Sequence, residues 1–120
     1  MSSRGKVIGI GGTFFRARDP EALKAWYMEH LGLPDAVFRS TAGIVVWDAF
    51  REDTDYFGPS GQQWMLNYRV DDLDAVLQRL RAAGVEVDDK TQDQEGVGRF
   101  GWAVDPEGNR FELWEPVEEM

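Results

Sequence analysis

Glu112 is the side chain whose setting in the sequence most suggests chemistry. It lies in the run FELW (111–114), the second arm of a hairpin whose turn is DPEGN (105–109). Proline and glycine in that turn favour a tight reversal. Because side chains alternate along a strand, Glu112 shares a face with Arg110 and Trp114. Its carboxylate is therefore either solvated on an outward face or held in a cleft, where it could act as a general acid or base.

The sequence offers few other groups for catalysis or metal binding. There is no cysteine, which excludes thiolate catalysis and cysteine-ligated metals. The single histidine, His30, falls in the last turn of a helix predicted at 20–31, where an imidazole can interact with the carbonyl ends. One histidine without a second histidine or a cysteine does not make a usual transition-metal site.

An internal repeat organises the chain. GTFFRARDP precedes the predicted helix at 20–31 and MLNYRVDDL precedes the one at 72–83, and each helix ends at a glycine. Aligning the two helix starts places Gly12 on Met65, Phe14 on Asn67 and Arg16 on Arg69. The closing strands IVVWDAF (44–50) and FELWEPV (111–117) align with Trp47 on Trp114, which sets Val45 opposite Glu112.

The remaining elements follow from local signals. Asp19 and Asp72 are suited to cap the two helices, and Gly32 and Gly84 to end them. Strands are predicted at 6–18, 36–40, 44–49, 64–70 and 85–87, a loop at 88–96, and the hairpin at 98–116. The first half is shorter between its terminal glycine and its tryptophan, so it should lack about one strand. Tyr56 and Phe57 should pin the connecting segment 51–63.

Length and charge bound the possible functions. The 120 residues predict a single domain, 1–120, with module one at about 6–50, a linker at 51–63 and module two at 64–117. A net charge of −9 disfavours nucleic acid and anionic membranes as partners. Without an apolar run long enough to span a membrane or a secretory signal, the sequence predicts a cytoplasmic protein.

Two such modules, with RVDDLDAVLQRLRAAGV and the terminal DPEGNRFELWEP, resemble the glyoxalase/bleomycin-resistance/dioxygenase group, the vicinal oxygen chelate superfamily. The resemblance covers nearly the whole chain. It implies an α+β fold in which paired βαβββ modules form a curved, mostly antiparallel sheet around a cleft, with the helices outside. It also implies a homodimer.

The resemblance places the usual metal ligands on the first and last strand of each module. Those positions are Gly12, Val45, Met65 and Glu112, of which only Glu112 suits a hard or borderline divalent ion. We therefore expect no metal and no other cofactor. Asp48, the nearest alternative carboxylate, has the opposite strand parity from Val45 and should point outward.

The same parity implies a cleft lined by a mixture of apolar and polar side chains. The candidate ligand-binding residues are Phe14, Arg16, Trp47, Met65, Asn67, Arg69, Arg110 and Trp114. Phe14, Val45 and Met65 could equally fill the space of a lost metal. An arginine could meet an anionic group of a ligand, and at least one of the three arginines should hold the Glu112 carboxylate.

Three classes of function follow. The first is a protein that, like the bleomycin-resistance proteins, binds a small, apolar or partly aromatic molecule without metal. The second is an enzyme of the lyase, isomerase or dioxygenase type that uses Glu112 as acid or base, or that holds a divalent metal weakly. The third is a structural or interaction domain. Whether any reaction is catalysed stays open at this point.

Overall fold

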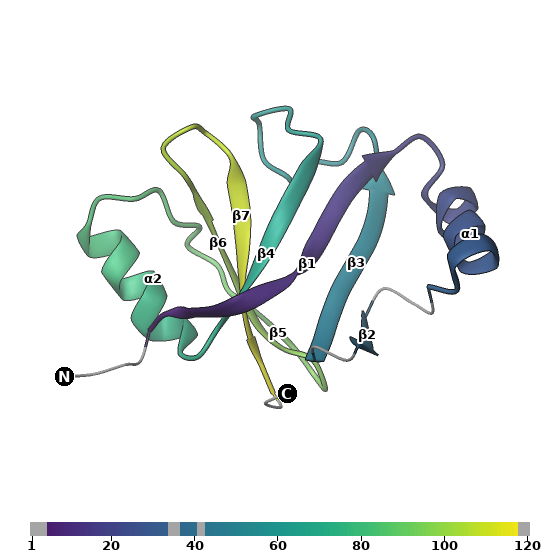
Figure 1. Cartoon of the computed structure of the whole chain (residues 1–120). Helices are drawn as coiled ribbons and strands as arrows, with labels where there is room; N and C mark the ends of the chain where they lie inside the picture. The colour runs from purple at the N-terminus through teal and green to yellow at the C-terminus, as the bar shows by residue number, and fades with distance from the viewer. Residues whose placement is uncertain (1–4, 34–36, 41–42, 118–120) are drawn as a thin grey trace.

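The computed structural model describes residues 5–33, 37–40 and 43–117 (Figure 1). Its elements are, in chain order, β1 (Val7–Ala17), α1 (Pro20–Leu31), β2 (Val37–Ser40), β3 (Gly43–Arg51), β4 (Trp64–Val70), α2 (Leu73–Ala82), β5 (Gln92–Gln94), β6 (Gly98–Val104) and β7 (Arg110–Pro116). The seven strands form one sheet in the order β2-β3-β1-β4-β7-β6-β5. The first module thus supplies three neighbouring strands and the second supplies four.

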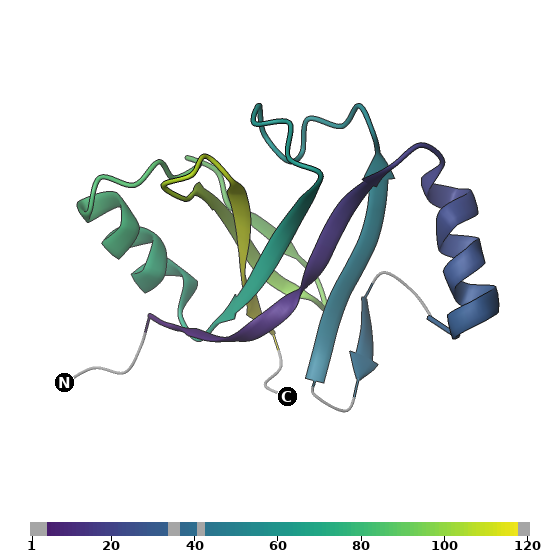
Figure 2. The ribbon, with the colours of Figure 1, turned by 45° about the horizontal axis from the view of Figure 1, so that its top comes forward.

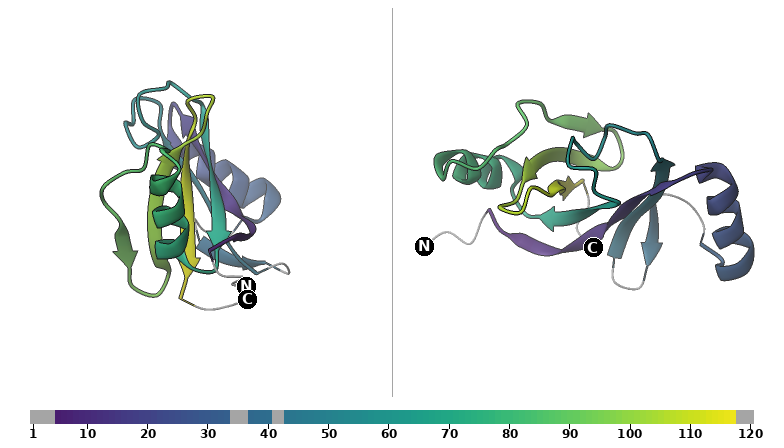
Figure 3. Two further views of the ribbon diagram at one scale, coloured as in Figure 1. Left: turned by 90° about the vertical axis from the view of Figure 1, so that its left-hand side faces the viewer. Right: turned by 90° about the horizontal axis from the view of Figure 1, so that it is seen from above.

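The sheet is curved and mixed. β1 pairs antiparallel with β4 at its centre, and each of these strands has a parallel partner on its other side, β3 and β7. The remaining pairs are antiparallel. Seen from above, the sheet curls around a concave side, and the two helices lie outside its two ends (Figure 3). The predicted α+β fold, with a first module shorter by one strand, is confirmed.

Local signals placed the element ends well. The Asp19 side chain accepts a hydrogen bond from the Ala22 amide at 3.1 Å, and Gly32 ends α1 with a left-handed φ of 73°. The strand predicted at 85–87 is wrong, because only Val87 forms a bridge there, to Ala103. The loop predicted at 88–96 contains β5. Residue 36 of the strand predicted at 36–40, and the ends 1–4 and 118–120 of the predicted domain, lie outside the described residues.

Side chains on the two faces of the sheet form two clusters. The cluster on the concave face consists of Phe14, Val46, Phe57, Met65, Phe100, Trp102 and Trp114. The cluster on the outer face, beneath α2, consists of Val70, Leu73, Val76, Leu77 and Leu113. Neither helix in the described part of the chain is long and apolar enough to cross a membrane.

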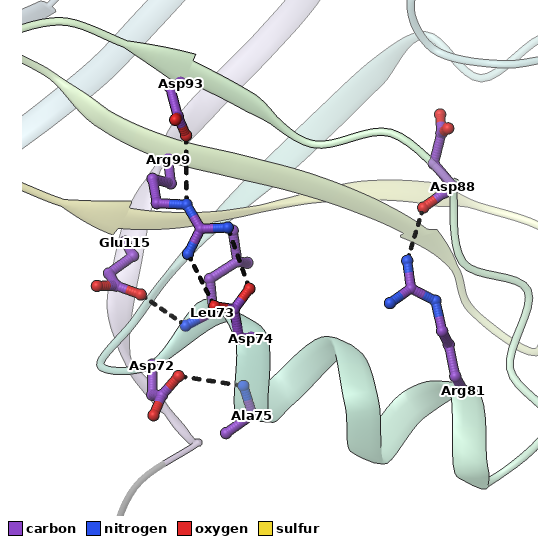
Figure 4. A network of polar contacts seen from close by, with 9 residues as sticks. All are labelled: Asp72, Leu73, Asp74, Ala75, Arg81, Asp88, Asp93, Arg99 and Glu115. Carbon is purple, nitrogen blue, oxygen red and sulfur yellow. Dashed lines mark hydrogen bonds and ion pairs between the residues drawn. The ribbon is translucent and has the colours of Figure 1, made fainter.

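α2 is tied to the sheet by polar contacts as well as by its apolar stripe (Figure 4). The Glu115 carboxylate accepts a hydrogen bond from the Leu73 amide at 2.7 Å, which joins the start of α2 to β7. The Arg99 guanidinium bridges Asp74 on α2 and Asp93 on β5, at 3.0 and 3.2 Å. By contrast, no residue of α1 is buried, and β1 and β4 lie uncovered between the helices (Figure 2).

The glycines of β1 allow close approach within the protein. A Cβ atom on Gly11 would overlap the Asn67 side-chain oxygen, and one on Gly12 would overlap the Val46 carbonyl oxygen. Gly12 also has a φ of 148°, and the pairing with β4 shifts register between Ile10 and Gly12. The space that the missing side chains leave is therefore occupied by this chain itself.

We predict that Gly11→Ala destabilises the fold by about 1 to 3 kcal/mol, because the new methyl group must displace Asn67 from beneath β1. Urea unfolding followed by tryptophan fluorescence measures the change. Gly9→Ala is the matched control, since a Cβ there lies 3.9 Å from its nearest neighbour, an Arg69 side-chain nitrogen. Equal stability of the two variants would contradict the prediction.

Candidate functional site

Glu112 is buried on the concave face, with 1% of its surface exposed. One carboxylate oxygen accepts a hydrogen bond from the Asn67 amide at 2.6 Å. The other accepts hydrogen bonds from the Trp102 indole at 2.9 Å and from the Tyr56 hydroxyl. All three donors are neutral groups, and they come from β4, β6 and the linker. The predicted strand parity, which turned Glu112 and Trp114 to the same face, is borne out.

Burial controls the protonation of Glu112 and of its hydrogen-bond donor Tyr56. Loss of water raises the pKa of Glu112 above its ordinary value of 4.5, while the three hydrogen bonds and the charge of Arg110 oppose the rise. Burial also raises the pKa of Tyr56, and the neighbouring Glu112 raises it further. Tyr56 therefore stays a neutral hydrogen-bond donor.

A cavity of about 200 Å³ opens beside Glu112. Its lining is Phe14, Val37, Val46, Asp48, Phe50, Tyr56, Gln92, Gln94, Val97, Phe100 and Glu112. Three of the rings meet closely: Phe50 stacks on Tyr56 with centroids 5.0 Å apart, and Phe14 meets Phe50 edge-on at 5.6 Å. Apolar walls with a few polar groups are typical of small-molecule sites.

Asp48 lies at this cavity, so the expectation that it points outward is wrong. The strand registers give the reason. Phe14 on β1 pairs with Asp48 on β3 in the same way that Asn67 on β4 pairs with Glu112 on β7. Asp48, not Val45, is thus the counterpart of Glu112 in the repeat, and aligning Trp47 with Trp114 set the closing strands out of register.

The five predicted ligand-binding residues other than the arginines fall into three groups. Phe14 lines the cavity, and Asn67 holds Glu112. Met65 and Trp114 are fully buried in the concave cluster behind it. Trp47 was predicted to face the cleft, but it packs against Phe15 and against Tyr27 of α1, because β3 presents the opposite parity to that expected.

The three arginines point to other partners, so the expectation that one of them holds Glu112 is wrong. Arg16 donates to the linker carbonyls of Glu52, Thr54 and Gln62. Arg69 donates to the Ile44 carbonyl at 2.6 Å.

Arg110 is the third of these arginines. It donates to the Tyr56 carbonyl at 2.9 Å and pairs with Asp88 at 3.3 Å, with its guanidinium 5.5 Å from the centre of the Trp102 ring. Each of the three arginines thus donates to at least one main-chain oxygen.

The donors at the repeat-equivalent positions do not fit the metal site of the superfamily. With the register corrected, these positions are Gly12, Asp48, Met65 and Glu112. Gly12 has no side chain, Met65 is in the core, and both Glu112 oxygens already accept hydrogen bonds. Among the described residues, no three His, Cys, Asp or Glu side chains gather as a metal site would need.

Sequence reasoning missed Trp102 and the hydroxyl role of Tyr56. A signal for Trp102 existed, since the turn at 105–109 pairs Val104 with Arg110 and therefore Trp102 with Glu112. No comparable signal exists for Tyr56, because the path of an irregular linker does not follow from strand periodicity.

Comparison with known proteins gives one family match. The model of the glyoxalase-like domain family matches residues 12–114. Among curated proteins, the chain is 35% identical over 71 residues to the anthracycline biosynthesis protein DnrV of Streptomyces peucetius, covering 52% of this chain and 26% of that protein. The chain thus spans about a quarter of that relative's length.

Solved structures share the fold. Methylmalonyl-CoA epimerase from Mycobacterium tuberculosis superposes with a TM-score of 0.67 at 22% identity, covering 98% of this chain and 93% of that one. A variant of the Streptomyces coelicolor epimerase, in complex with 2-nitronate-propionyl-CoA, gives 0.70 at 17% identity, with coverages of 94% and 100%. At these identities the likeness is one of fold.

We predict that Glu112→Gln removes a pH-dependent cost of folding. Because the folded pKa lies above the unfolded one, the wild type loses stability as pH rises from about 4.5 through the folded pKa. With the Asn67 amide turned over, the glutamine amide can instead donate to the Asn67 oxygen, which has no hydrogen-bond partner among the described residues. The melting temperature of the variant minus that of the wild type should therefore grow with pH.

Thermal unfolding between pH 4 and pH 8 makes this measurement. Glu107→Gln, in the exposed turn before β7, is the control and should follow the wild type. A difference for Glu112→Gln that stays constant or shrinks as pH rises would show that burial does not raise the Glu112 pKa.

Proposed function

Because the chain belongs to the glyoxalase-like domain family of the vicinal oxygen chelate superfamily, we propose that it binds a small, partly aromatic or apolar molecule in the cavity beside Glu112. The partners are then a small molecule and a second copy of the chain, in a cytoplasmic protein. Its net charge of −9 disfavours nucleic acid and anionic membranes.

The observation that carries this proposal is the cavity itself. A sheet that served only as a scaffold would fill its concave side, since protein interiors are close-packed. Here about 200 Å³ stays open between Phe14, Phe50 and Phe100. The polar groups of its lining come from four separate segments and are Asp48, Tyr56, Gln92, Gln94 and Glu112.

We also propose that binding needs no metal. Asp48 and Glu112 are the only carboxyl groups in the lining among the described residues, and Tyr56, Asn67 and Trp102 already donate to Glu112, so the three or four protein ligands of a metal site are not met. Asp48 pairs with Lys24 at 3.0 Å, which occupies one of its oxygens.

A methylmalonyl-CoA-type substrate fits this cavity poorly. The free carboxylate of such a substrate would face Asp48 and Glu112, and the cavity lining in the described part of the chain contains no basic side chain. Such a carboxylate would find no countercharge in the lining, and the Asp48 carboxylate would repel it. The epimerases thus resemble this chain in fold, and their substrate is not the one we propose.

An enzyme is a second candidate, favoured by the raised pKa of Glu112. A buried carboxyl group with a perturbed pKa beside a cavity is typical of general acid–base catalysis. Turnover that Glu112→Gln abolishes while ligand binding persists would select this candidate over simple binding.

We predict that the protein binds one small ring-containing molecule per chain and no stoichiometric Zn, Ni, Mn or Fe. The purified protein is incubated with compounds of up to about ten heavy atoms. Native mass spectrometry then detects a bound organic molecule and a bound metal in the same spectrum. The variant Val37→Trp should lose the organic adduct. Val37, on the edge strand β2, lies in the cavity lining, so a tryptophan there should fill the cavity. Val117→Trp, exposed after β7, is the control.

One transition metal per chain, retained through dialysis, would contradict the metal-free site. An organic adduct that persists unchanged in Val37→Trp would place the ligand elsewhere on the protein.

We propose that the homodimer forms through the uncovered outer face of β1 and β4. Val7, Trp64 and Leu66 line a groove of about 780 Å³ there, and all three are well exposed. Arg79 and Asp105 line the same groove. In a two-fold symmetric contact, Arg79 of one copy can meet Asp105 of the other copy, and the reverse. This favours a second copy of this chain as the partner. The β1 glycines do not contribute, because their space is filled from within.

We predict a dimer at tens of micromolar that Trp64→Glu converts to monomer, since Trp64 is 63% exposed in the groove and tolerates a charge in the isolated chain. Light scattering coupled to size exclusion gives the mass. Trp26→Glu, on the exposed side of α1, is the matched control and should stay dimeric. A monomeric wild type would rule out the dimer, and dissociation by Trp26→Glu would move the interface to α1.

A further inference from the structure

The charge of the cavity is one-sided. Asp48 and Glu112 contribute carboxyl groups to its lining, and Gln92 and Gln94 contribute neutral amides. The lining in the described residues includes no lysine, arginine or histidine. Arg16, Arg69 and Arg110 are not part of the lining, although the charge of Arg110 acts on Glu112 from outside it.

Two pairs of aromatic rings at the cavity meet at nearly right angles. The planes of Phe14 and Phe50 meet at 87°, and those of Phe14 and Tyr56 at 86°, while Phe50 and Tyr56 are stacked. Perpendicular rings offer a guest both ring faces and ring edges. Ring faces attract cations through their negative quadrupole.

Asp48 is only partly neutralised. Its side chain is 27% exposed and meets the Lys24 ammonium at 3.0 Å, from outside the lining. Lys24 is the residue that competes for the Asp48 charge, so it sets how much of that charge is free for a guest.

We propose that the molecule bound in this cavity is an organic cation, with its ammonium group between the Glu112 and Asp48 carboxyl groups and its apolar body against Phe14, Phe50 and Phe100. The proposal rests on the small-molecule binding proposed above and names the ligand class. The volume of about 200 Å³ corresponds to about seven water molecules, so the cavity takes a small ammonium compound or the head group of a larger one.

Three probes of one shape and different charge test the ligand class: benzylammonium, benzyl alcohol and benzoate. Isothermal titration calorimetry at low salt should give benzylammonium the lowest Kd, at least tenfold below that of benzyl alcohol, and no measurable heat for benzoate. Benzyl alcohol bound as tightly as benzylammonium, or benzoate bound more tightly, would overturn the cation while leaving small-molecule binding intact.

Two substitutions with opposite expected signs test the assigned contacts. Asp48→Asn should weaken benzylammonium about tenfold and leave benzyl alcohol unchanged. Lys24→Gln should strengthen benzylammonium several-fold, because it frees the Asp48 carboxylate. A purely structural role of the pair would make both variants weaker or leave both unchanged, and either result overturns the assignment. Glu107→Gln, in the exposed turn, is the control.

Binding of none of the three probes also overturns the proposal. In that case the organic adduct in the native mass spectrum decides separately whether the cavity binds a small molecule at all.

Discussion

The burial of the Glu112 carboxyl group, whose hydrogen-bond donors in the described part of the chain are all neutral, is the constraint on which the concave side depends. Taking such a group out of water is costly unless hydrogen bonds replace the lost water. Tyr56, Asn67 and Trp102 provide them, and each comes from a different segment, so the linker, β4 and β6 must all reach the same point. Asn67 in turn fits only because Gly11 on β1 has no side chain, which extends the constraint into the first module.

The two modules share one backbone arrangement, but their carboxyl groups, Asp48 and Glu112, have different surroundings. Asn67 lies opposite Glu112 and donates a hydrogen bond to it, whereas Phe14 lies opposite Asp48 and has no donor to offer. Glu112 is consequently held deep in the sheet, and Asp48 remains partly exposed and turns to Lys24. The strand registers alone establish that Asp48 and Glu112 occupy equivalent positions.

The sequence predicted the frame better than the site, for identifiable reasons. Helix ends followed from Asp19, Asp72 and the glycines, and the parity of β7 followed from a turn with unambiguous residues. The parity of β3 could not be obtained in this way, because IVVWDAF is apolar on both faces and its register is fixed by pairing with β1. Matching one tryptophan to another therefore misplaced Asp48. The arginines were misassigned because sequence spacing does not show competition from main-chain carbonyls in the linker and on β3.

In the proposed complex, the charge of the guest and the proton of Glu112 are coupled. Burial raises the Glu112 pKa, which favours the neutral acid, and a cation beside it favours the ionised form. Beside it, burial keeps Tyr56 neutral, while Arg110 pairs with Asp88 and Asp48 pairs with Lys24. A cation would thus lower the Glu112 pKa as it binds, whereas an anion would raise it further and gain no countercharge. The burial that makes Glu112 costly to ionise therefore also makes the cavity discriminate between guests by charge.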